Sequence, residues 1–163
     1  MAIKTIKVKG DGITLEGISS GVVSPGEVVS VTSAASDTFI RHAVVGGNVA
    51  PILIALEDEN QGSEIGTNYA TAVQMFVWAP LSGSIFYGLI SNGQSVTKGG
   101  LVMSDGAGRL DAYVAQAETI GADSSGNITT IAPNRIIGVA LDTVDMSSSS
   151  AADPSGRCRI LVR

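Results

Sequence analysis

The sequence predicts an all-β protein: a β-sandwich or a partly open β-barrel with long loops, little helix and an extended N-terminal arm. Three observations support this fold class. Apolar residues make up 44% of the 163 residues but aromatic residues only 4%, so the core is aliphatic. The chain has 20 glycines, many of them in turn motifs between short apolar runs. Several of these runs alternate apolar and polar residues with the period of two that a half-buried strand requires.

The first segment, residues 2–9, alternates apolar side chains with threonine and lysine, and we interpret it as an edge strand or a free arm. Gly10 and Gly12 end it, and a Gly/Ser-rich connection is expected to lead to Gly21. The predicted organisation is therefore an N-terminal arm or edge strand with a linker over residues 1–20, followed by a β-rich domain over residues 21–163.

Strands are predicted along the rest of the chain wherever β-forming residues stand between turn signals. Pro25 and Gly26 indicate a type II turn before the first of them. One segment is ambiguous, because its apolar residues also fit a helical face with Thr67 or Asn68 as N-cap, but its β-formers and Pro80 favour a strand. The ambiguous segment is residues 72–78, and the others are residues 27–32, 38–45, 51–56, 84–90 and 157–163.

The clearest local signal is a hairpin within residues 95–113. An apolar strand ending at Met103 is followed by Ser-Asp-Gly-Ala-Gly and a second strand that opens at Arg109. The two glycines supply the positive φ angles that a tight turn needs. Residues 135–144 are a later strand, and residues 115–134 are expected to form a long polar connection.

A weak internal repeat accompanies this hairpin. Residues 23–29 align with residues 96–102, and residues 54–58 align with residues 139–142. Both copies contain a turn with glycine, then a strand, and later a strand that ends in Ala-Leu and an acidic residue. Either two similar β units are fused in this chain, or short β motifs coincide by chance.

Charge and composition exclude several kinds of partner. The net charge of −5 argues against nucleic acid, because phosphate binding needs a cationic face. No apolar run is long enough to span a membrane, and no secretory signal is visible at the N-terminus. The single cysteine, Cys158, excludes an intrachain disulfide framework and a cysteine zinc site, and is interpreted as a buried small hydrophobe.

No residue pattern indicates catalysis, a cofactor or a metal. His42 is the one histidine and is interpreted as a partly exposed strand residue, although a Ser-His-Asp triad could assemble in space. The acidic run at residues 57–64 does not have EF-hand spacing and is interpreted as a solvated loop in preference to a calcium site. Trp78 is either a sugar-stacking platform or a core or interface anchor. We therefore expect no enzyme, no cofactor and no metal.

Eight segments follow one another in a characteristic order: residues 26–32, 41–43, 48–50, 55–58, 74–80, 93–96, 104–108 and 137–141. This order resembles the head decoration (capsid cement) proteins of tailed bacteriophages. The resemblance covers roughly residues 20–163, and one departure is the uncharged segment 80–85. It implies an all-β virion protein, made in the host cytoplasm and added to the outside of the expanded capsid, often as a homotrimer, to stabilise the shell. The family has no catalytic residues to carry over.

The predicted partners are the major capsid protein and further copies of this chain. The basic N-terminal arm is expected to contact the shell by strand addition or through its lysines, and large apolar residues are expected near a trimer axis. Two alternatives stay open: a carbohydrate-binding β-sandwich that uses Trp78 and the acidic loop, and another phage structural protein such as a tail component. The candidate interface residues are Ile3, Lys4, Ile6, Lys7, Lys9, Trp78 and Phe86.

Overall fold

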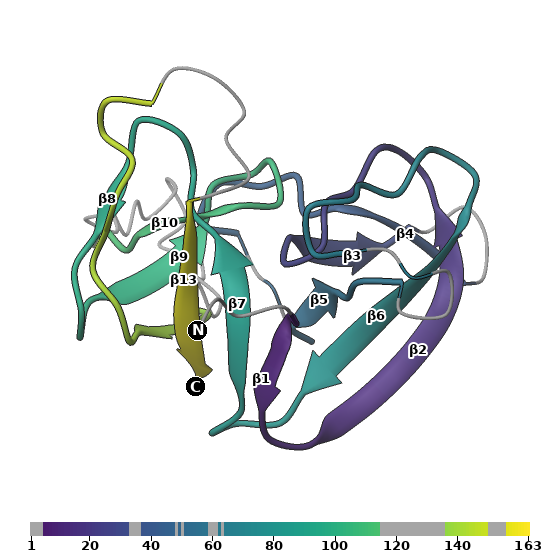
Figure 1. The fold of residues 1–163 in the computed structure, drawn as a ribbon, viewed down its shortest axis with the longest axis horizontal. Coiled ribbons are helices and arrows are strands. Elements are labelled where there is room, and N and C mark those ends of the chain that lie inside the picture. Colours follow the sequence, from purple (N-terminus) through teal and green to yellow (C-terminus); the bar gives the residue numbers. More distant parts are fainter. Residues whose placement is uncertain are drawn as a thin grey trace, which may run out of the picture.

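The computed structural model describes residues 5–32, 37–47, 49, 51–58, 62, 64–114, 136–149 and 156–163. Within these ranges every regular element is a strand, so the all-β prediction is confirmed. The strands form two lobes that lie side by side (Figure 1). We call the lobe formed by β2 to β6 the barrel unit, and the lobe formed by β7 to β13 together with β1 the sheet unit.

The barrel unit closes on itself in the strand order β2-β4-β3-β5-β6. Neighbouring strands are antiparallel except β2 and β4, whose short parallel contact pairs Ile18 with Thr38 and completes the closure. Closure leaves few exposed strand edges within this lobe. The strands are β2 (Gly12–Ser19), β3 (Val28–Val31), β4 (Thr38–Arg41), β5 (Leu53–Ala55) and β6 (Gln74–Pro80).

The sheet unit is a six-stranded sheet in the order β1-β7-β13-β11-β9-β10, with the pair β8 and β12 beside it. All of its ladders are antiparallel. The predicted hairpin is confirmed, because β9 pairs with β10 across the Ser-Asp-Gly-Ala-Gly turn. The strands are β1 (Lys7–Lys9), β7 (Ile85–Leu89), β8 (Ser95–Val96), β9 (Leu101–Ser104), β10 (Leu110–Ala112), β11 (Gly138–Ala140), β12 (Val144–Asp145) and β13 (Arg157–Val162).

The two units have the same topology. Taken in chain order, β2, β3, β4, β5 and β6 correspond to β7, β9, β10, β11 and β13. Each antiparallel pair of the barrel has its counterpart in the sheet: β2 with β6 and β7 with β13, β5 with β6 and β11 with β13, and so on through β3 and β4. Even the parallel closure recurs, as an isolated parallel bridge between Ile90 and Leu110.

The correspondence extends to single hydrogen bonds. Gly26 and Gly99 both have positive φ, 88° and 85°. The Gly26 N–H donates to the Ala55 carbonyl at 2.7 Å, and the Gly99 N–H donates to the Ala140 carbonyl at 2.8 Å. These are the positions that align in the sequence repeat, so the chain contains two copies of one β unit.

A buried glycine recurs at the equivalent position of β2 and β7. Gly17 faces the ring of Phe39, and a Cβ added there would lie inside contact distance of that ring. Gly88 faces Leu110, and a Cβ added there would lie 2.6 Å from the Leu110 Cδ1. In each unit the missing side chain lets one large residue of the facing strand fill the centre.

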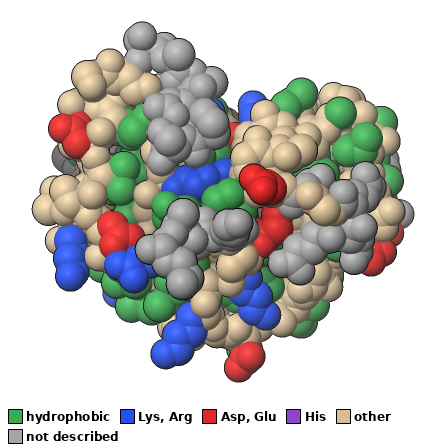
Figure 2. Space-filling view, viewed as in Figure 1, with side chains coloured by type: hydrophobic (Ala, Val, Ile, Leu, Met, Phe, Trp, Pro, Cys, Tyr) green, Lys and Arg blue, Asp and Glu red, His purple; other side chains and the backbone are tan. Residues whose placement is uncertain are grey.

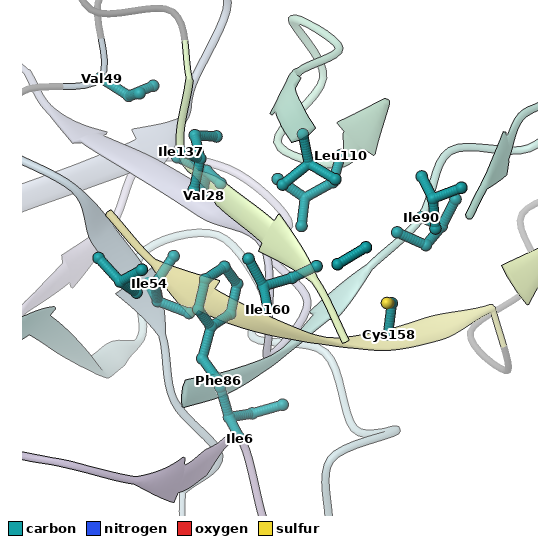
Figure 3. Packing of buried hydrophobic residues seen from close by; sticks show 14 of the residues in the cluster. Ile6, Val28, Val49, Ile54, Phe86, Ile90, Leu110, Ile137, Cys158 and Ile160 are labelled. Atoms are coloured by element: carbon teal, nitrogen blue, oxygen red, sulfur yellow. The ribbon is translucent and has the colours of Figure 1, made fainter. Parts of the chain in front are cut away.

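The buried apolar side chains form two clusters, of which one joins the two units. One lies inside the barrel unit and includes Phe39, Met75 and Val77. The larger one fills the sheet unit and continues across the junction, where the outer face of the barrel contributes Val28, Ile54 and Trp78. In this cluster Phe86 lies among Ile6, Ile54 and Ile160 (Figure 3). The junction is therefore core and not a loose contact between domains.

The predicted connection after Gly10 is wrong over most of its length, because residues 12–19 form β2, the longest strand. Its glycines are strand residues here: Gly17 makes room for Phe39, and Gly12 lies against the Trp78 indole. The strand predicted at 38–45 is shorter and ends at Arg41. The strand choice at residues 72–78 is confirmed by β6. The connection predicted at residues 115–134 lies outside the described residues.

Replacing Gly88 with alanine should lower the free energy of unfolding by about 1–3 kcal/mol, because the new methyl group would overpack the space that Leu110 fills. Urea unfolding measures the change. Gly21→Ala is the matched control, because nothing lies within 4 Å of its added Cβ, and it should change stability by less than about 0.5 kcal/mol. Equal losses for the two variants would contradict the packing argument.

Candidate functional site

The described part of the N-terminal segment is an edge strand of the sheet unit, not a free arm. Its first buried residue, Ile6, is 0% exposed, and its N–H donates to both carboxylate oxygens of Glu57, at 3.2 and 3.0 Å. The Tyr87 N–H in turn donates to the Ile6 carbonyl at 2.9 Å. Residues 5–9 are therefore fastened from both lobes, since Glu57 follows β5 of the barrel unit and Tyr87 lies in β7.

The candidate interface residues separate into two groups. Ile6, Trp78 and Phe86 are all 0% exposed, so they build the chain's own core and offer no side-chain surface to a capsid or a neighbouring subunit. Lys7 and Lys9 are exposed on β1. Ile3 and Lys4 lie outside the described residues. The expectation that Trp78 or Phe86 lines a trimer axis is corrected by their burial.

Trp78 is also unavailable as a sugar-stacking platform. The Lys7 ammonium lies 5.2 Å from the centre of its ring, and the Cα of Gly12 packs so closely that an added Cβ would clash with the indole nitrogen. A lysine over an indole face is a favourable cation–π contact. Lys7 thus links β1 to the barrel unit while Lys7 itself stays exposed.

The buried carboxylate of Glu27 interacts with arginines from both lobes. Glu27 is 0% exposed, and it accepts hydrogen bonds from the Ser24 N–H at 2.8 Å and from the Arg41 Nε at 2.7 Å. The Arg109 Nε, from the sheet unit, lies 3.9 Å from its other oxygen. Burial raises the pKa of Glu27, and the hydrogen bonds and the two arginines oppose that shift. The network is a structural clamp that joins the two units.

Arg157 makes a second polar connection from β13 to the barrel unit. Its guanidinium donates to the carbonyls of Pro25 at 2.8 Å and Ile65 at 2.5 Å. Both carbonyls belong to loops of the barrel unit, and the Arg157 side chain is buried. Burial lowers the pKa of Arg157. Because each guanidinium has several donors in a fixed plane, one arginine can hold two loops in place.

His42 is buried, which corrects its interpretation as a partly exposed strand residue. Its Nδ1 lies 2.8 Å from the Ser104 Oγ, at the end of β9. Ser104 is 0% exposed and also accepts a hydrogen bond from the Gly106 N–H. A hydroxyl buried in this way cannot reach a substrate, so the pair is explained as a link between the end of β4 and the hairpin of the sheet unit.

Two members of the acidic run are buried, not solvated. Glu57 holds the start of β1, and Asp58 is 6% exposed. The rest of that run lies largely outside the described residues. In the described part of the chain, no group of three or more His, Cys, Asp or Glu side chains is placed to hold a metal ion.

Cys158 is buried as predicted, and burial raises the pKa of its thiol. Among the described residues no helix is long and apolar enough to cross a membrane.

The turn of the β9–β10 hairpin gathers two carboxylates around Ser91. Asp105 accepts hydrogen bonds from the Ser91 hydroxyl at 2.6 Å and from the N–H groups of Ala107 and Arg109. Asp111 lies close by, and burial, with the negative charge of Asp105, raises the pKa of the Asp111 carboxyl. Asp105 organises the turn, whereas the charged form of Asp111 is disfavoured by burial.

The exposed surface offers two features that fit binding to another protein. Basic side chains lie at intervals along the lower edge of the molecule, some of them below the junction of the lobes, where Figure 1 places β1 (Figure 2). The second feature is β2, whose Ile13, Leu15 and Ile18 are 66%, 37% and 44% exposed. Sequence reasoning missed it, although Ile13 and Leu15 alternate with polar residues, because the neighbouring glycines indicated a connection.

Comparison with known proteins gives one informative result. No family model matches the chain, and no curated protein matches it. Among solved structures, the chain is similar to the N base of the head fiber gp8.5 of bacteriophage phi29. The similarity has a TM-score of 0.53, covers 94% of this chain and 95% of that one, and comes with 7% sequence identity. At this identity the similarity shows a shared fold.

Two aspartates should change the pH dependence of stability in opposite directions. The pKa of Asp111 is higher in the folded chain than in the unfolded chain. Its contribution to the free energy of unfolding is therefore fully present below the unfolded pKa and is lost as the pH rises through the folded pKa. Asp111→Asn should therefore become more stable than the parent chain as the pH rises from acid to neutral. Urea unfolding across that range measures the difference.

Asp142 provides the contrast. A hydrogen bond from Arg159 lowers the pKa of its carboxyl, so its contribution is present above the unfolded pKa and is lost as the pH falls through the folded value. Asp142→Asn should be less stable than the parent at neutral pH, with a difference that shrinks toward acid pH. Parallel curves for both variants and the parent would contradict these assignments.

Proposed function

We propose that this chain is a structural virion protein that binds the outside of a phage head and stabilises the expanded shell. The observation that carries the proposal is the similarity of nearly the whole fold to the base of a phage head fiber. The sequence resemblance to head decoration proteins points independently to the same place in the virion. The proposed partner is the major capsid protein, and the proposed site of synthesis is the host cytoplasm.

The exposed face of β1 is the proposed capsid contact. Lys7 and Lys9 are exposed there, while the same strand is fastened from both lobes through Ile6. A rigid strand that carries cations suits an acidic protein surface, because the charges lose little freedom on binding. This proposal replaces contact through a free arm. The homotrimer implied by the resemblance stays a prediction.

A second candidate function is the base of a fiber that projects from the head. It is favoured by the description of the similar structure, which is itself the base of a head fiber. A fiber base must bind the shell firmly but need not protect it. The two roles therefore differ in whether the bound protein raises the temperature at which heads release their DNA.

The test is co-sedimentation with purified, expanded heads of the phage that encodes this chain. The parent protein should bind, and Lys7→Glu with Lys9→Glu should weaken binding at least about tenfold, because two exposed charges are reversed. Lys98→Glu is the matched control, as it reverses an exposed charge in the turn before β9 and should leave binding unchanged.

Absence of binding by the parent protein would contradict the virion role altogether. Equal losses for the double variant and the Lys98 control would contradict the β1 contact alone. Heads that carry the protein should release DNA at a higher temperature than bare heads if it is a cement, and at the same temperature if it is a fiber base.

A further inference from the structure

The internal repeat exposes a difference between the two units. In the sheet unit, β7 is paired on both sides, with β13 on one edge and β1 on the other. Its counterpart β2 is paired along one edge with β6, over residues 12–18. On its other edge, the described residues pair with β2 at Ile18 and Ser19 alone, through β4. The place that β1 takes beside β7 therefore has no described occupant beside β2.

The residues of β2 that direct their N–H and C=O groups to this edge can be identified from the hydrogen bonds at the C-terminal end of the strand. The Ser19 N–H donates to Val73, on the β6 side, whereas the Ile18 N–H donates to Asp37, on the β4 side. Because successive residues of a strand point to opposite edges, Thr14 and Glu16 direct their N–H and C=O groups to the same side as Ile18. In the sheet unit the residue equivalent to Glu16 is Tyr87, and its N–H donates to Ile6 of β1.

The side chains on β2 also indicate a missing neighbour, because they are more exposed than their counterparts on β7. Leu15 pairs with Val77 of β6 at the rung where Phe86 pairs with Ile160 of β13. Phe86 is 0% exposed, in a cluster that includes Ile6, whereas Leu15 is 37% exposed and its neighbour Ile13 is 66% exposed. An edge strand usually carries lysine, proline or a bulge that prevents pairing. Residues 12–16 have none of these, and Glu16 is their one charge.

We propose that the free edge of β2 pairs with β2 of a second copy of this chain, antiparallel about a two-fold axis at Thr14. The edge is self-complementary in this register. Thr14 lies opposite Thr14 of the second copy and Gly12 lies opposite Glu16, so no two carboxylates face each other. On the core-facing side, Ile13 of each copy lies opposite Leu15 of the other, in the pairs where side chains approach most closely.

The register follows from the length of the β2 edge to which none of the described residues pairs. An axis at Thr14 uses residues 12–16, all of which lie short of the β4 contact at Ile18. Moving the axis one residue on, to Leu15, would place Gly12 opposite Ile18, whose N–H already donates to Asp37. Moving it to Glu16 would bring the two acids together. Figure 1 shows β2 starting beside β1 at the lower end of the molecule and running up along the outer rim of the barrel lobe.

The pairing does not depend on the proposed role in the phage head. It is an alternative to the homotrimer that the resemblance implies, and it is tested on the purified chain alone. The mass in solution should be that of a dimer. Thr14→Pro should give a monomer that folds as the parent does, because the lost N–H points away from β6. Ile13→Glu should also give a monomer, because two acids would be placed against leucine. Leu81→Glu is the control: Leu81 is 61% exposed but lies outside β2, so this variant should stay dimeric.

A cysteine scan tests the register. Thr14→Cys should form a disulfide between copies on oxidation, because directly opposed residues of a hydrogen-bonded pair have Cα atoms about 5.5 Å apart. Glu16→Cys should not, since its two copies would lie about four residues apart along the strands. The one native cysteine, Cys158, is buried and does not interfere. A monomer, a trimer, a dimer that persists in Thr14→Pro, or equal cross-linking of the two cysteine variants would overturn the proposal.

Discussion

The structure depends on one apolar junction, where the outer face of a closed barrel packs on the inside of a second sheet. Val28, Ile54 and Trp78 belong to the barrel by their strands but to the core of the sheet unit by their contacts. Burial of this kind is the dominant favourable term in folding. The junction also explains the polar residues around it, because Glu27, Arg157 and Glu57 satisfy the backbone and charged groups that the packing removes from water.

The repeated topology gives each unit the same plan but a different use of its surfaces. In the barrel, the outward face of β3, β5 and β6 is buried against the other lobe. The corresponding face of β9, β11 and β13 presents Leu101, Val139 and Leu161, which are half-buried. A duplicated unit can diverge in this way because its strand pairing is fixed by backbone hydrogen bonds, while side chains on each face can change with their surroundings.

Local signals in the sequence predicted the parts of the fold that local chemistry determines. The Asp105-Gly106 hairpin, the Pro25-Gly26 turn and the repeat around Gly26 and Gly99 are all present, because glycine at a positive φ angle marks a turn wherever it occurs. The strand β2 was missed for the opposite reason. Gly12 and Gly17 are strand residues only because Trp78 and Phe39, distant in sequence, fill the space beside them.

The candidate site was harder to predict, because burial is a property of the whole fold. Ile6, Trp78 and Phe86 are the large apolar residues that an interface would use, yet partners from both lobes enclose them. Glu57 stood in an acidic run that indicated solvent or a cation, and its partner is a backbone N–H 51 residues away. Lys7 and Lys9 could be placed on the surface, since charged side chains seldom lack water.

The central position of β13 has a consequence for how the chain folds during synthesis. The strand ladders of the barrel involve no residue beyond Pro80, so its strands can pair while the later strands are still being made. In the sheet unit, β13 lies between β7 and β11, so its sheet has a gap in the middle until β13 itself has left the ribosome. Until then β7 and β11 present unpaired edges. The apolar outer face of the barrel is the surface against which these strands pack before β13 joins them.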